Sequence, residues 1–239
     1  AHSLLQLCNE RPASDEASLV LEAVIEGSLA ANQLGRAYWG ADLWIKHRPG
    51  DIQKAQGHYW RGRVHHADRD YSKAREDYSR AVELAPDHYP TRLWLATLLI
   101  EKEPREATEH LEWLKRHRPR ELAVRFQTAR WERNMGRLDV AAATLDALLA
   151  EAPDSPHVVP ALVERGLVAM DLRRPDEAES WLRRGLAVSP LDRDVNLALG
   201  ECMQHLGRPD EARVFQDFVQ QLDAETERAR AEQKKRKPG

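Results

Sequence analysis

Histidine is the residue type in this sequence that most readily suggests chemistry, because three of the ten histidines fall close together. His58 and His65 are seven residues apart and share one face of a helix, whereas the adjacent His66 points elsewhere. Two metal ligands on one helix are typically about four residues apart. The spacing therefore favours polar, partly exposed side chains on a helical surface over a metal site.

Other signatures of catalysis are absent from the sequence. There is no GxxxxGK[ST] phosphate loop, no GxGxxG after a strand, no GxSxG nucleophile motif and no HExxH zinc motif. Acidic and basic residues alternate, as in EKEPREATEHLEWLKR, which is typical of ion pairs on solvated helix faces. Cys8 and Cys202 are the only cysteines and show no CxxC spacing. We expect no catalytic residue, metal or cofactor, and predict that the chain is not an enzyme.

The composition indicates a folded chain with balanced charge. Hydrophobic residues make up 42% and charged residues 31% of the sequence, so a core can be buried. The net charge of −3 argues against nucleic acid as a ligand, and the basic cluster at 234–237 is interpreted as a solvated tail. No apolar run approaches the roughly 20 residues of a membrane-spanning helix. The scarcity of cysteine favours the cytoplasm, and a periplasmic or extracellular location after processing stays open.

Three rows of residues recur with a period of 33 to 37 residues. Prolines follow amphipathic runs such as AVELAP and LAVSP, where proline ends a helix because it lacks the N–H group. A second row of alanines and a third of glycine or alanine keep the same period, and small side chains let paired helices approach closely. The rows comprise Pro12, Pro49, Pro86, Pro119, Pro153 and Pro190; Ala37, Ala74, Ala107, Ala141, Ala178 and Ala212; and Gly62, Ala96, Ala129, Gly166 and Gly200.

Short turns of similar sequence separate the third row from the second. They read MGRLDVA, RRPDEA and LGRPDEA, each with an aspartate shortly before the alanine. These aspartates, Asp139, Asp176 and Asp210, are expected to cap the second helix of each pair. Most of the seven tryptophans are expected to pack between helices, and Trp39 and Trp44 are those expected to be exposed.

The three rows resemble the tetratricopeptide repeat, whose signature places a small residue in the first helix, alanine in the second and proline at the end. The match covers nearly the whole chain and is strongest from Tyr89 to Val219. Of the large aromatic residues near the start of the first helix, Trp60 and Trp94 are retained. The resemblance implies an all-α fold, a right-handed superhelical solenoid of antiparallel helix pairs with about 13 helices.

The expected organisation has three parts. Residues 1–12, with Leu4 and Leu7 on one face, are interpreted as the second helix of a truncated preceding repeat. Such a face would expose apolar surface and could support self-association. Residues 223–239 are expected to form a polar helical extension and basic tail. Six hairpins fill 13–222, at 13–49, 50–86, 87–119, 120–153, 154–190 and 191–222.

The resemblance also implies a binding face, because in this family the first helix of each pair lines the inner groove and contacts peptides. Arginine and aromatic side chains on that face suit an acidic-hydrophobic peptide, since guanidinium groups bind carboxylates bidentately. We therefore predict a protein-interaction scaffold that binds a partner peptide or domain in the concave groove. The alternative is a regulatory or structural segment of a larger multidomain enzyme. The predicted contacts are Tyr59, Arg63, His66, Phe126, Arg130, Arg133 and Asn134.

Overall fold

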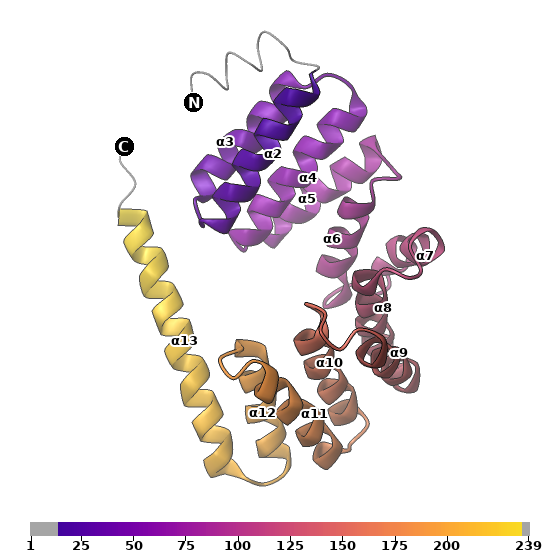
Figure 1. Ribbon diagram of the computed structural model, residues 1–239, viewed down its shortest axis with the longest axis vertical. Coiled ribbons are helices and arrows are strands. Elements are labelled where there is room, and N and C mark those ends of the chain that lie inside the picture. The colour runs from indigo at the N-terminus through magenta and orange to yellow at the C-terminus, as the bar shows by residue number, and fades with distance from the viewer. Residues whose placement is uncertain (1–13, 236–239) are drawn as a thin grey trace. The chain divides into compact units, whose positions relative to one another are not determined.

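The computed structural model describes residues 14–235, with side chains described up to residue 229 (Figure 1). This part of the chain is all-helical, with twelve α-helices and no strand, and the predicted fold class is confirmed. The lone helix expected at 1–12, with Cys8, and the end of the basic tail, Arg236 and Lys237, lie outside the described residues. The helices are α2 (Asp15–Ala30), α3 (Leu34–His47), α4 (Asp51–Ala67), α5 (Tyr71–Leu84), α6 (Tyr89–Ile100), α7 (Ala107–His117), α8 (Leu122–Asn134), α9 (Leu138–Glu151), α10 (Val158–Asp171), α11 (Pro175–Val188), α12 (Arg193–His205) and α13 (Pro209–Lys235).

The chain divides into two compact units, 1–118 and 119–239. The N-terminal unit holds the pairs α2–α3, α4–α5 and α6–α7, and the C-terminal unit holds α8–α9, α10–α11 and α12–α13. Within each unit, every pair also packs on the next one along the chain. The repeat boundaries proposed above stay a prediction.

Most of the turns inside the helix pairs share one backbone conformation. In five of the six turns inside the described pairs, one residue adopts a left-handed conformation and the next N–H group bonds back to a carbonyl five residues earlier. This geometry ends a helix and satisfies its last carbonyls. The turn between α6 and α7 lacks such a residue; instead Arg75 of α5 binds Glu103 at 2.5 Å and Glu106 at 2.7 Å. The left-handed residues are Asn32, Arg69, Gly136, Arg173 and Gly207.

The aspartates of these turns do not cap helices, contrary to the sequence-based expectation. Asp139, Asp176 and Asp210 lie inside the first turns of α9, α11 and α13. A carboxylate there is still favourable, because the unpaired N–H groups at the start of a helix carry partial positive charge. Side-chain caps occur elsewhere, for example at α5, where Asp70 accepts from the N–H of Lys73 at 3.2 Å.

The rows of small residues lie where helices cross. A methyl group added to Gly62 of α4 would lie 2.5 Å from the ring of Tyr78 on α5, and one added to Gly166 of α10 would lie 2.6 Å from Leu182 on α11. Ala178 and Ala212 are buried at the corresponding crossings. The period seen in the sequence therefore has a steric cause.

Trp44 was expected to be exposed, and that expectation is wrong. Its side chain is 2% exposed and lies beside Gly57 of α4, where an added methyl group would be 3.2 Å from the indole. The glycine opens space for the ring at the seam between α3 and α4. Trp39 is partly buried.

Candidate functional site

The seven predicted contact residues fall in two groups, one in each unit. Tyr59, Arg63 and His66 lie on α4, and the remaining four lie on α8. The two groups differ in what their arginines contact.

In the N-terminal unit, Arg63 is surrounded by aromatic rings. Its guanidinium carbon lies 4.2 Å from the ring centroid of Trp94 on α6, and 5.9 and 5.8 Å from those of Tyr59 and Trp60. Nη1 donates a hydrogen bond to the Tyr59 hydroxyl at 3.0 Å. Within the part of the chain that the structure describes, no carboxylate pairs with Arg63. A cation over ring faces is attracted by their quadrupoles, so the group is held in place without a counter-ion.

Two histidines border this arginine. His66 packs edge-on against Trp94, with ring centroids 5.0 Å apart, and its Nδ1 is buried without a hydrogen-bond partner. Burial, and then the charge of Arg63, lower the pKa of His66. His88, whose ring centroid is 5.4 Å from that of Tyr59, has its pKa lowered by burial. Both rings are therefore neutral near pH 7, and Arg63 supplies the positive charge of this cluster.

In the C-terminal unit, the arginines of α8 already contact carboxylates. Arg133 donates to Glu164 and to Asp171 of α10, each at 2.8 Å. Arg130 lies 3.8 Å from Glu164, and Asn134 donates to the backbone carbonyl of Arg130 at 3.0 Å. Burial opposes the charge of Arg133, but Glu164 and Asp171 prevail and raise its pKa. A partner's carboxylate would have to displace these groups.

The Arg133 pairs allow a prediction about stability. Arg133→Ala should destabilise the C-terminal unit by about 2 kcal/mol, because Glu164 is only 5% exposed and would lose its closest cation. Arg125→Ala, on the same helix, should cost less than about 1 kcal/mol, since its partner Glu151 is exposed. Urea denaturation of the two variants checks this; equal losses would contradict the structural role given to Arg133.

His58 and His65, which lie close to His66 in the sequence, belong to a polar network around Asp77 of α5. His58 Nδ1 is 2.8 Å from Asp77 Oδ1, and Arg61 donates to both carboxylate oxygens at 2.7 and 2.9 Å. His65 Nε2 lies 3.6 Å from Oδ2, and its Nδ1 lies 2.8 Å from the hydroxyl of Tyr38 on α3. The network ties α3, α4 and α5 together. Among the described residues, no group of three or more His, Cys, Asp or Glu side chains is arranged to hold a metal ion.

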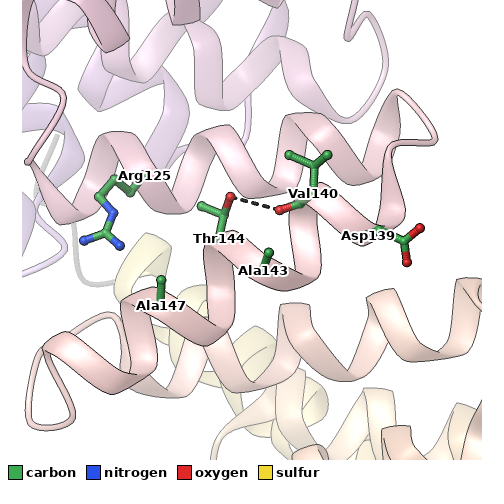
Figure 2. Close-up of a pocket in the computed structure, with 6 residues that line it drawn as sticks. All are labelled: Arg125, Asp139, Val140, Ala143, Thr144 and Ala147. Atoms are coloured by element: carbon green, nitrogen blue, oxygen red, sulfur yellow. Dashed lines mark hydrogen bonds between the residues drawn. The ribbon is translucent and has the colours of Figure 1, made fainter.

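A shallow hollow of about 550 Å³ lies along α9 (Figure 2). Methyl groups form much of its lining, and Figure 2 shows Arg125 and Asp139 toward its two ends. The Thr144 hydroxyl is bonded to the Val140 carbonyl at 2.9 Å, and Arg125 is paired with Glu151. Thr144 and Arg125 thus have partners within the chain, and the described lining residues form no acid–base or nucleophilic pair. The lining residues are Arg125, Asp139, Val140, Ala143, Thr144 and Ala147.

Comparison with known families identifies this architecture. Three family profiles, each described as a tetratricopeptide repeat, match residues 55–88, 123–155 and 163–224, together more than half of the chain. The chain belongs to the tetratricopeptide-repeat family. The resemblance inferred from the proline, alanine and glycine rows is confirmed. Tetratricopeptide repeats generally form protein-interaction scaffolds without catalytic activity. None of the described helices is long and apolar enough to cross a bilayer.

Solved tetratricopeptide-repeat structures share the fold. A thermophilic protein of Thermus thermophilus is 25% identical, with a TM-score of 0.62 over 74% of this chain and 98% of that one. A protein of Parabacteroides merdae is 14% identical, with a TM-score of 0.70 over 92% and 89%. YrrB, described as having an unusual peptide-binding site, is 20% identical, with a TM-score of 0.52 over 72% and 86%. No curated protein matches the sequence.

Sequence reasoning placed Arg63 and Arg130 at equivalent positions, one residue after Gly62 and Ala129, but missed their partners. Arg63 stacks on Trp94, and Arg130 lies 3.8 Å from Glu164. Trp94 and Glu164 each lie two residues before the small residue of the next first helix, Ala96 and Gly166. The residue type at that position is the sequence signal that could have distinguished an arginine stacked on an indole from one beside a carboxylate.

Proposed function

We propose that this tetratricopeptide-repeat chain is a protein-interaction scaffold that docks an acidic, partly apolar segment of a partner protein on its N-terminal unit. The docking surface is the Arg63 face, defined by Ile52, Tyr59, Arg63, His66 and Trp94. The observation that carries the proposal is the Arg63 guanidinium, stacked on Trp94 without a carboxylate partner among the described residues.

The chemistry of the face supports an acidic ligand. A partly buried guanidinium gains a charge-assisted, bidentate contact when a carboxylate docks on it, and its position is already fixed by Trp94 and Tyr59. Arginine and aromatic side chains are also the residue types that most often carry binding energy at interfaces.

An apolar contact is available on the same side of α4. Ile52 is 73% exposed and precedes Tyr59 by seven residues, which places both on one face of the helix. A partner segment that combines an acidic residue with an apolar one would therefore match Arg63 and Ile52. In the C-terminal unit, the contacts proposed from the sequence, Phe126, Arg130, Arg133 and Asn134, are expected to be weaker, because Arg133 already binds two carboxylates.

Selection of binders from a random peptide library displayed on phage tests this proposal. Wild-type protein should enrich peptides that contain acidic and apolar residues. Arg63→Gln should weaken their binding by about tenfold to a hundredfold, in line with the loss of a hydrogen-bonded charge contact. Arg63→Lys should give an intermediate loss, because it keeps the charge but not the planar donor pair.

The matched control is Arg80→Gln, which removes an exposed arginine of α5 that pairs locally with Glu83. It should leave peptide binding unchanged. Enriched peptides without acidic residues, or equal binding by the wild type and Arg63→Gln, would contradict the proposed site.

A further inference from the structure

Three seams of the N-terminal unit each contain a half-buried histidine that no carboxylate contacts among the described residues. We propose that this unit is acid-sensitive: protonation of His66, His88 and His110 loosens the contacts among α4, α6 and α7 while the C-terminal unit keeps its fold. The inference concerns the fold alone and does not depend on the proposed binding of a peptide.

His110 of α7 faces Arg92 of α6. Its Nδ1 lies 3.3 Å from Arg92 Nη1, and a guanidinium can only donate, so this nitrogen must be the unprotonated acceptor. Adding a proton there removes the bond and places two positive charges together beside a residue that is 6% exposed. Glu109, 3.8 Å from Arg92, offsets this only in part because it is largely in solvent. Burial and then Arg92 lower the pKa of His110.

His88 joins the start of α6 to α4. Its Nε2 lies 2.7 Å from the amide oxygen of Gln56, which requires an N–H on that nitrogen, and its Nδ1 lies 2.6 Å from the hydroxyl of Thr91. The neutral ring satisfies both contacts, because Nδ1 can accept from the hydroxyl. A second proton on Nδ1 could still be donated to the Thr91 hydroxyl, but the added positive charge would have no carboxylate among its contacts. Tyr59 packs on the ring from α4, with centroids 5.4 Å apart.

His66 of α4 lies between Tyr71 at the start of α5 and Trp94 of α6. Its buried Nδ1 has no acceptor for a proton, and the Arg63 guanidinium stacks on the same indole. Protonation would therefore create a second, unsolvated positive charge at this seam. The surrounding groups are Arg63 and the uncharged Tyr71 and Trp94.

The direction of the pH effect follows from these shifts. Each of the three histidines has a pKa below its ordinary value in the folded chain, so the unfolded chain takes up protons first. Their contribution to stability is complete above the ordinary histidine pKa of about 6.5 and is lost as the pH falls below it. His65 adds to this, because burial lowers its pKa although Asp77 and Asp70 oppose the shift.

The C-terminal unit provides an internal comparison. It has two histidines: His157 is half-buried at the start of α10, where it packs on Phe126, and His205 is exposed at the end of α12. Its ion pairs depend on carboxylates, which ordinarily titrate near pH 4. Lowering the pH from 7.5 to 5.5 therefore protonates histidines and spares most acidic groups.

Hydrogen–deuterium exchange of the full chain, at pH 7.5 and pH 5.5 and corrected for the intrinsic pH dependence of exchange, tests the proposal. Protection of α4, α6 and α7 should fall at pH 5.5, while that of α10, α11 and α12 should persist. Equal responses of the two units would overturn it.

A variant that combines His66→Phe and His110→Asn should reduce the loss of protection. Phenylalanine keeps the ring packing on Trp94, and the asparagine side chain can still accept from Arg92. The control is His117→Asn, an exposed histidine on α7, which should respond to pH as the wild type does. A double variant that loses as much protection as the wild type at pH 5.5 would also overturn the proposal.

Discussion

Replacing Gly62 with alanine should destabilise the N-terminal unit by about 2 kcal/mol, even though alanine is the better helix former. The added methyl group would lie 2.5 and 2.6 Å from Cε1 and Cδ1 of Tyr78. That ring is fully buried, so it cannot swing into solvent. Overpacking costs about 1–3 kcal/mol, and a contact this close to a fixed ring should fall at the upper end of that range. The higher helix propensity of alanine offsets about 1 kcal/mol, which leaves a net loss of about 2 kcal/mol.

Gly27→Ala is the matched control, because Gly27 is an exposed position of α2 with no atom within 4 Å of an added methyl group. This change should stabilise the unit by up to about 1 kcal/mol. Hydrogen exchange in increasing urea reports on individual helices, and the two variants should shift the opening of α4 in opposite directions. If Gly62→Ala opens at the wild-type urea concentration, the close crossing of α4 and α5 is wrong.

Asp77→Asn should have a still larger effect, about 3 kcal/mol, because it removes the negative charge at the centre of a buried network. Asp77 of α5 is 5% exposed and contacts three side chains of α4, those of His58, Arg61 and His65. An amide of the same size preserves the packing but leaves Arg61 without its buried counter-charge. Hydrogen exchange of α4 and α5 in urea measures this loss.

Asp42→Asn is the control for this change, since Asp42 contacts the same Arg61 at 3.2 Å but is itself largely exposed. It should cost less than about 1 kcal/mol. A cost equal to that of Asp77→Asn would show that burial does not set the strength of the network.

The network should also respond to strong acid. Burial alone would raise the pKa of Asp77, but the hydrogen bonds from His58 and Arg61 outweigh it and lower the pKa. Its stabilisation is therefore present above the ordinary aspartate pKa of about 4 and is lost as the pH falls through the lower folded-state value. Asp77→Asn should remove that part of the acid sensitivity.

The helical pairs were predictable because their sequence signals have local causes. Proline stops a helix by its own covalent structure, and Gly62 is small because Tyr78 lies against it. Packing at the seams was less predictable. Trp44 is buried because Gly57 lies on the neighbouring helix, and no pattern around Trp44 itself reports that glycine.

The candidate site, too, was predictable from the sequence only in its local features. Helical spacing placed Arg63 and Arg133 on the first helices, but their roles depend on what the next first helix presents. Trp94 leaves the charge of Arg63 uncompensated, whereas Glu164 and Asp171 neutralise that of Arg133. Such pairings join residues more than thirty positions apart, so they require the register between repeats and not only the pattern within one helix.

The turn between α6 and α7 makes one contact of the N-terminal unit sensitive to the salt concentration of the solvent. Turns that depend on a left-handed residue are set by backbone sterics, which dissolved salt does not alter. The α6–α7 turn has no such residue: backbone hydrogen bonds close it, such as that from the Glu103 N–H to the Leu99 carbonyl at 2.8 Å, and Arg75 ties Glu103 and Glu106 to α5 near the surface. Exposed charges are screened over about 10 Å at 0.1 M salt, so raising the ionic strength should weaken the ion pairs that attach this turn to α5. Of the hairpin turns between the described helices, it is the one whose ion pairs are not accompanied by a left-handed residue, so screening of those pairs should loosen it most.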